Sequence, residues 1–98
     1  MSGDRKIRIG IIGVGQIGKV HLENYTTIPG VEIVAACDID TPELKRVAER
    51  FKIGHTYEKF RELLRRDDIE AVDVCLHNNL HAPVTIAALE AGKHVYCE

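Results

Sequence analysis

Three glycines near the start of the chain constrain its fold more than any other feature. Gly13, Gly15 and Gly18 follow an apolar run and have the G-x-G-x-x-G spacing that opens a dinucleotide-binding βαβ unit. The first glycine allows the tight turn after the strand, the second lets the backbone approach a pyrophosphate, and the third allows close helix–strand packing. We expect a helix to begin at about Gln16. The N–H groups and the dipole at the N-terminus of this helix favour the negative charge of a pyrophosphate. The spacing therefore predicts a nucleotide site rather than a merely structural turn.

The type of nucleotide depends on Asp38, which lies about 20 residues after Gly18 at the end of a second apolar run. A carboxylate there accepts hydrogen bonds from both hydroxyls of an adenosine ribose and repels a 2′-phosphate, and no arginine immediately follows it. Asp38 therefore favours NAD over NADP. Helix capping is the alternative role for such an acid, and it suits Asp40 better, because Asp40 directly precedes Thr41-Pro42.

Strand-like and helix-like segments alternate along the whole chain. Strands are predicted over 6–12, 31–37, 55–57, 71–76 and 94–97, with a helix in each interval. This alternation predicts one α/β domain over residues 1–98, a doubly wound parallel sheet of the Rossmann type with strand order 3-2-1-4-5. The full fold would need a sixth strand, which is absent. A ligand is expected over the carboxyl ends of the strands, where residues 13–18, Asp38 and residues 77–81 converge.

Turn and capping residues predict where the helices begin and end. Thr41 is expected to cap the second helix, with Pro42 at its first position, and Gly54 is expected to end it. The last helix is expected to follow a polar loop at 77–79, with Pro83 in its first turn and Gly92 just after its end.

Charge and cysteine content exclude several classes of partner. A net charge of −2 without a basic block argues against nucleic acid and anionic membranes, and no apolar run is long enough to span a bilayer. Cys37, Cys75 and Cys97 lack C-x-x-C spacing and lie in apolar runs, which favours buried, reduced thiols over disulfides or zinc ligands.

We expect a cytoplasmic protein that binds a small molecule. We also expect a homo-oligomer, because strand 94–97 would form an apolar sheet edge.

The segment after the fourth predicted strand carries the remaining candidate residues. Asn78 and His81 lie where a nicotinamide would be bound, and either could orient it by hydrogen bonds, although His81 could equally cap the last helix. His77 and His81 have i, i+4 spacing but no accompanying carboxylate, so we expect no metal site. His21 and His55 are expected to be structural or surface groups.

Three blocks of the sequence resemble the N-terminal domain of the Gfo/Idh/MocA oxidoreductases. The blocks are Gly-Val-Gly-Gln-Ile-Gly-Lys-Val-His over 13–21, Asn78-x-x-His81, and Ala-Gly-Lys-His-Val-Tyr-Cys-Glu over 91–98. The third is the most specific, because family members typically continue Ala-Gly-Lys-His-Val with two residues and then Glu-Lys-Pro. The resemblance covers essentially the whole chain.

The resemblance implies an NAD(P)-dependent enzyme that oxidises or reduces a carbon bearing a hydroxyl or keto group, usually on a sugar, cyclitol or related compound. Hydride moves to or from the nicotinamide while a lysine assists proton transfer. It also implies three groups of cofactor-binding residues. These are Gly13, Gly15, Gln16, Ile17 and Gly18 for the pyrophosphate, Asp38 for the adenosine ribose, and Asn78, His81 and Glu98 beside the nicotinamide half.

The chain departs from the family pattern at two places. Leu76-His77 stands where the family commonly has Thr-Pro, and the sequence ends at Glu98, before the Lys-Pro that would supply the catalytic lysine. The family's C-terminal α/β substrate domain is also absent. We therefore expect a truncated domain of a dehydrogenase, one that binds cofactor without turnover and holds no catalytic residue.

Two alternatives remain open at this stage. The chain could be a non-catalytic module that binds NAD(H) as a redox sensor or scaffold. It could also be a class I methyltransferase, although that class usually spaces its glycines G-x-G-x-G and does not need Gly18.

Overall fold

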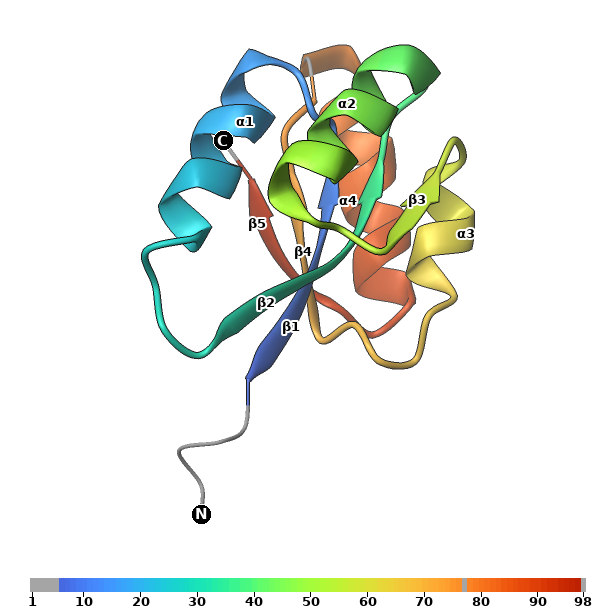
Figure 1. Cartoon of the computed structure of the whole chain (residues 1–98). Coiled ribbons are helices and arrows are strands. Elements are labelled where there is room, and N and C mark those ends of the chain that lie inside the picture. Colours follow the sequence, from blue (N-terminus) through green and yellow to red (C-terminus); the bar gives the residue numbers. More distant parts are fainter. Residues whose placement is uncertain (1–5, 77, 98) are drawn as a thin grey trace.

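Five parallel strands form one sheet in the order β3-β2-β1-β4-β5, which confirms the predicted order (Figure 1). The structure is a computed structural model that describes residues 6–76 and 78–97. The strands are β1 (Ile7–Ile12), β2 (Val31–Cys37), β3 (His55–Tyr57), β4 (Ala71–Val74) and β5 (His94–Cys97). The central strand β1 pairs with β2 on one side and with β4 on the other, so the chain crosses over β1 between its two halves.

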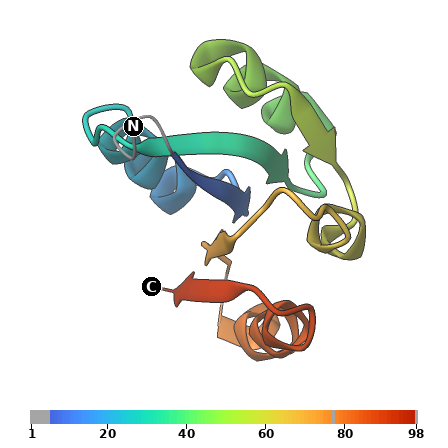
Figure 2. The same ribbon diagram turned by 90° about the horizontal axis from the view of Figure 1, so that it is seen from below.

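Helices cover both faces of the sheet, as expected for a doubly wound fold. They are α1 (Gln16–Tyr25), α2 (Thr41–Phe51), α3 (Phe60–Leu64) and α4 (Asn78–Glu90). Helices α1 and α2 lie on one face, and α3 and α4 lie on the other (Figure 2). Among the described residues, no helix is both long and apolar enough to cross a bilayer.

Strand β1 contributes to the apolar core on both faces, because successive side chains of a strand point in opposite directions. Ile11 packs with Leu22 and Val47 under α1 and α2. Its neighbour Ile12 packs with Leu63 and Val84 under α3 and α4. The burial of both faces explains why β1 and β2 read as nearly continuous apolar runs.

Helix α2 differs at both ends from the prediction. Its N-cap is Asp40, so the capping role that suited Asp40 is confirmed and the one expected of Thr41 is wrong. An Asp40 carboxylate oxygen accepts a hydrogen bond from the N–H of Glu43 at 3.2 Å. Its C-terminus is formed by Lys52 in the left-handed region, with φ of 58°, not by Gly54. The N–H of Ile53 then donates to the carbonyl of Ala48 at 2.8 Å. This bond closes the helix two residues before the glycine.

The passage from β4 to α4 lies two residues earlier in the chain than predicted. Strand β4 ends at Val74, although the N–H of Cys75 still donates to Ile12 O at 2.8 Å. Helix α4 begins at Asn78, so Asn78 and Asn79 are helical, not part of a loop, and residue 77 lies outside the described residues. Pro83 is therefore inside the helix, where its missing N–H costs one intrahelical bond.

The end of α4 is as predicted. Gly92 has φ of +80°, its N–H donates to Leu89 O, and the N–H of Lys93 donates to Ala88 O. This pair of bonds is a Schellman motif, which favours glycine at that position. Strand β5 then forms one edge of the sheet, where the expected self-association stays a prediction.

The C-terminal ends of α2 and α4 allow a matched test of backbone strain. Lys52→Gly should stabilise the domain by about 1 kcal/mol, because a Cβ in the left-handed region costs roughly 1–2 kcal/mol and Lys52 is exposed. Gly92→Ala should destabilise it by a similar amount. Urea denaturation with unchanged m values measures both changes. A lower midpoint for Lys52→Gly would show that Lys52 is not strained.

Candidate cofactor site

The carboxyl ends of β1, β2 and β4 surround a cleft of about 350 Å³. Its walls include Gly13 and Gly15 after β1, Asp38 after β2, Cys75 and Leu76 after β4, and Leu80 from α4. The predicted convergence of the glycine turn, Asp38 and the segment after β4 is therefore present.

Two of the three glycines are required by the protein's own backbone. Gly13 has φ of +97°, and a Cβ there would lie 2.4 Å from the carbonyl oxygen of Cys75. A Cβ on Gly18 would lie 2.2 Å from the carbonyl oxygen of Gly13. A Cβ on Gly15, in contrast, would meet no atom within 4 Å. The space over Gly15 is therefore open to a ligand that approaches the backbone.

The N-terminus of α1 lies beside this open space. Gly15 is the N-cap residue, no side chain caps the helix, and its first turn holds no acidic residue. Gln16 and Ile17 occupy the first two positions and are exposed. Their N–H groups and the helix dipole favour an anion at this end.

Asp38 connects the glycine turn to the start of the second crossover. One carboxylate oxygen accepts a hydrogen bond from the N–H of Val14 at 2.8 Å, and the other accepts one from the N–H of Asp40 at 2.9 Å. These bonds hold the half-buried side chain in one orientation. Each oxygen keeps a lone pair for a further donor, such as a ribose hydroxyl. The hydrogen bond between Asp38 and Val14 was not predicted.

The α4 side of the site is described in part. Asn78 is the first residue of α4, its side chain is outside the described part, and Glu98 lies beyond the described residues. His81 is the fourth residue of α4, so the helix-capping alternative for it is wrong, because the helix begins three residues earlier. Its Nε2 atom is buried and has no hydrogen-bond partner among the described residues. A polar ligand group could satisfy this nitrogen.

A buried polar cluster under the glycine turn was not predicted. Asp73, on β4, is the buried charged side chain among the described residues, with 1% of its surface exposed. Its Oδ2 atom lies 2.6 Å from His21 Nδ1 and accepts a hydrogen bond from the Tyr25 hydroxyl at 2.7 Å. Burial and the bond to Asp73 raise the pKa of Tyr25, so the phenol stays protonated. His21 thus belongs to this buried cluster, whereas His55 is exposed.

The described thiols differ in their surroundings. Cys37 is buried, and burial, together with the neighbouring charge of Asp38, raises the pKa of its thiol to about 12. It is a protonated and unreactive core residue, as predicted. Cys75 is only half-buried and donates a hydrogen bond to Asp73 Oδ1 at 3.3 Å. The side chain of Cys97 is outside the described part.

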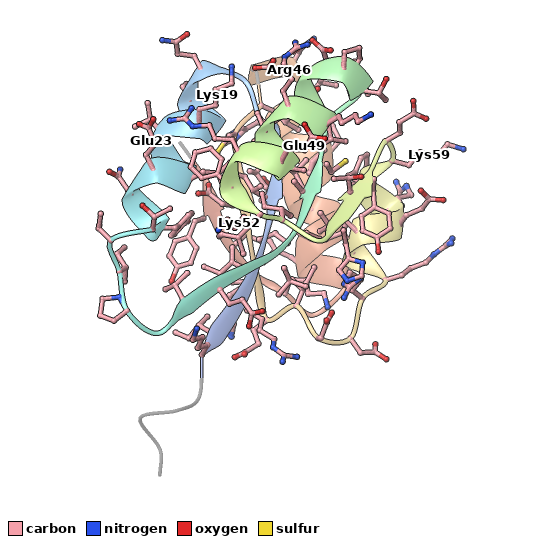
Figure 3. The ribbon with its side chains drawn as sticks, in the orientation of Figure 1. Lys19, Glu23, Arg46, Glu49, Lys52 and Lys59 are labelled. Atoms are coloured by element: carbon pink, nitrogen blue, oxygen red, sulfur yellow. The ribbon has the colours of Figure 1, made fainter. Side chains whose placement is uncertain are left out.

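Ion pairs join α1 to α2 on the surface that Figure 3 shows. Lys19 pairs with Glu43, and Glu23 pairs with Arg50. Lys19 and Arg46 hold the pKa of the Glu43 carboxyl below its usual range. Exposed pairs of this kind contribute little to stability, but these two link the helices that precede and follow β2 in the chain.

Comparison with known proteins identifies the relatives of this arrangement. Residues 7–98 match a family described as an oxidoreductase family with an NAD-binding Rossmann fold, Gfo/Idh/MocA. The inositol 2-dehydrogenase of Salmonella typhimurium is 37% identical over 94 residues, which are 94% of this chain and 28% of that protein. The myo-inositol 2-dehydrogenase of Thermotoga maritima is 36% identical over 92 residues, again 94% of this chain and 28% of the relative.

A solved structure shows the same fold with a cofactor present. Scyllo-inositol dehydrogenase from Lactobacillus casei, with bound NAD(H) and scyllo-inositol, superposes with a TM-score of 0.89 at 32% identity. The match covers 95% of this chain and 28% of that one. The chain thus spans a little over a quarter of the length of these relatives.

The glycine geometry predicts unequal effects on stability at two nearby positions. Gly18→Ala should destabilise the domain by about 1–3 kcal/mol, because the new methyl group meets the Gly13 carbonyl. Gly15→Ala should change stability by less than about 0.5 kcal/mol, since the space there is open. Urea denaturation compares the two. Equal losses at both positions would contradict the close contact between α1 and the turn.

Proposed function

Because the chain belongs to the Gfo/Idh/MocA family of oxidoreductases, we propose that it is the NAD-binding domain of a dehydrogenase for a sugar, cyclitol or related hydroxy compound. The substrate class is supported by the relatives, which include inositol 2-dehydrogenases and an enzyme solved with scyllo-inositol. The proposal that the chain is one domain of such an enzyme is supported by the length of the relatives, because this chain covers only 28% of them. Substrate contacts are expected mainly in the remaining part of such a protein.

The fixed carboxylate of Asp38 is the observation that carries the proposed cofactor preference. The N–H groups of Val14 and Asp40 hold this carboxylate at the wall of the cleft, where it would accept hydrogen bonds from both hydroxyls of the adenosine ribose. No lysine or arginine is among the described residues that line the cleft, so no cation there would meet a 2′-phosphate. Both features favour NAD over NADP.

The other proposed contacts are with the pyrophosphate and the nicotinamide half of the dinucleotide. The pyrophosphate would lie over Gly15 and accept hydrogen bonds from the N–H groups of Gln16 and Ile17. The nicotinamide half would lie near Asn78, His81 and Glu98, where the buried Nε2 atom of His81 would gain a polar partner. When bound, the cofactor supplies the hydride chemistry.

Catalysis needs more than these contacts. In the family that the chain resembles, a lysine assists proton transfer, and none of the described residues that line this cleft is a lysine. Cofactor binding alone neither positions a substrate nor moves a proton. We therefore propose that the 98-residue chain binds NAD(H) without turnover.

Asp38→Ala tests the proposed cofactor site. It should weaken NADH binding about tenfold or more, because hydrogen bonds to a charged group contribute about 1.5–3 kcal/mol. It should also reduce the preference of the chain for NADH over NADPH. Isothermal titration calorimetry measures both cofactors. Asp40→Ala is the matched control: it removes the α2 cap but keeps the backbone N–H, so NADH affinity should be retained.

Two results would contradict this assignment. One is an Asp38→Ala variant that binds NADH as tightly as the parent chain. The other is a folded Gly15→Val variant with unchanged affinity, because a branched side chain would fill the space proposed for the pyrophosphate.

The absence of turnover is tested separately. The purified chain, saturated with NAD, should form no NADH above the blank with myo-inositol, scyllo-inositol or glucose. Absorbance of the reduced nicotinamide is the measurement, and the calorimetric titration shows that the cofactor is bound. NADH formation that scales with protein concentration would overturn the proposal.

A further inference from the structure

We propose that His21, Asp73 and Cys75 form a binding site for a thiophilic divalent cation such as Zn²⁺, beneath the glycine turn. Each residue offers one ligand atom, and these atoms all lie within 4.8 Å of one another. Imidazole nitrogen, carboxylate oxygen and thiolate sulfur are the three donor types that zinc takes in proteins. This site is separate in chemistry from the proposed dinucleotide site and does not depend on it.

The distances within the cluster are close to those of a tetrahedral site. His21 Nδ1 lies 3.4 Å from Cys75 Sγ, which lies 3.3 Å from Asp73 Oδ1. Zinc–ligand bonds of about 2.0–2.3 Å place tetrahedral ligands roughly 3.3–3.7 Å apart, so both separations match. His21 Nδ1 also lies 2.6 Å from Asp73 Oδ2, the oxygen that would not coordinate, in a hydrogen bond that the cation would replace.

The charge of the site suits its burial. Asp73 is almost fully buried, so an uncompensated cation or anion there would be costly. A dication bound by one carboxylate and one thiolate is neutral in total. Coordination through Asp73 Oδ1 would leave Oδ2 to accept the hydroxyl of Tyr25, an outer partner of the kind that orients metal-binding carboxylates.

A cation can reach the cluster from solvent. The side chain of His21 is 20% exposed, and Cys75 is half-buried and lines the cleft of about 350 Å³. Three protein ligands would leave the fourth position to water. Binding would release the Cys75 thiol proton to solvent and leave the His21 proton on Nε2, so that Nδ1 can coordinate. Affinity should therefore rise with pH.

Titration with Co²⁺ under a non-coordinating reductant tests the site directly. The wild-type chain should develop a near-ultraviolet thiolate-to-cobalt charge-transfer band with the visible bands of tetrahedral Co²⁺, and one equivalent of Zn²⁺ should abolish them. Cys75→Ser should lose the charge-transfer band. Cys37→Ala, which removes a buried thiol outside the cluster, should keep it.

A second variant keeps the test decisive if Cys75→Ser does not fold, as judged by circular dichroism. His21→Gln should weaken Co²⁺ binding about tenfold or more while the thiol remains. The proposal is overturned if the wild-type chain shows no charge-transfer band at millimolar Co²⁺. It is equally overturned if the band persists in folded Cys75→Ser, or if His21→Gln binds Co²⁺ as tightly as wild type.

Discussion

The close contact of three backbone segments at Gly13 is the constraint on which the rest of the structure depends. The N–H of Gly13 donates to Cys37 O at the end of β2, and the N–H of Cys75 donates to Ile12 O at the end of β1. The carbonyl groups of Cys75 and Gly13 then occupy the space that a Cβ would need on Gly13 and Gly18. At this point β1, β2, β4 and α1 meet without side chains between them. The carboxyl ends of these strands and the N-terminus of α1 therefore face the same cleft.

Electrostatics at this end of the domain follow from that packing. The turn directs the N–H of Val14 to Asp38, which orients a carboxylate before any ligand arrives. The uncapped start of α1 lies a few residues further on, so a site for negative charge and an acceptor for hydroxyl groups are adjacent. These are the two groups that we propose bind the pyrophosphate and the adenosine ribose.

Local sequence signals predicted most of the fold but not its buried polar contacts. Apolar runs and the glycine spacing predicted every strand of the sheet and its order, because these signals lie within a few neighbouring residues. Helix ends were less accurate: Lys52 takes a conformation that favours glycine, and Pro83 lies inside a helix. The Asp73 cluster joins residues 48 to 54 positions apart, and only the charge within an apolar strand hinted at it. The predicted site residues Asn78 and His81 came from their place after the fourth strand, and Glu98 came from family resemblance. The burial of His81 Nε2 could not be predicted from the sequence.

The position of β1 in the sheet has a consequence for the order of folding. Its partner β2 follows within about twenty residues, but its other partner, β4, is Ala71–Val74. During synthesis, one edge of the central strand and its α3–α4 face therefore stay uncovered until most of the domain has emerged. Long-range pairings of this kind slow folding, because the entropy of closing the long intervening loop is lost before the pairing stabilises the chain. The same topology makes the finished domain cooperative, since the loss of β4 would uncover β1 and β5 together.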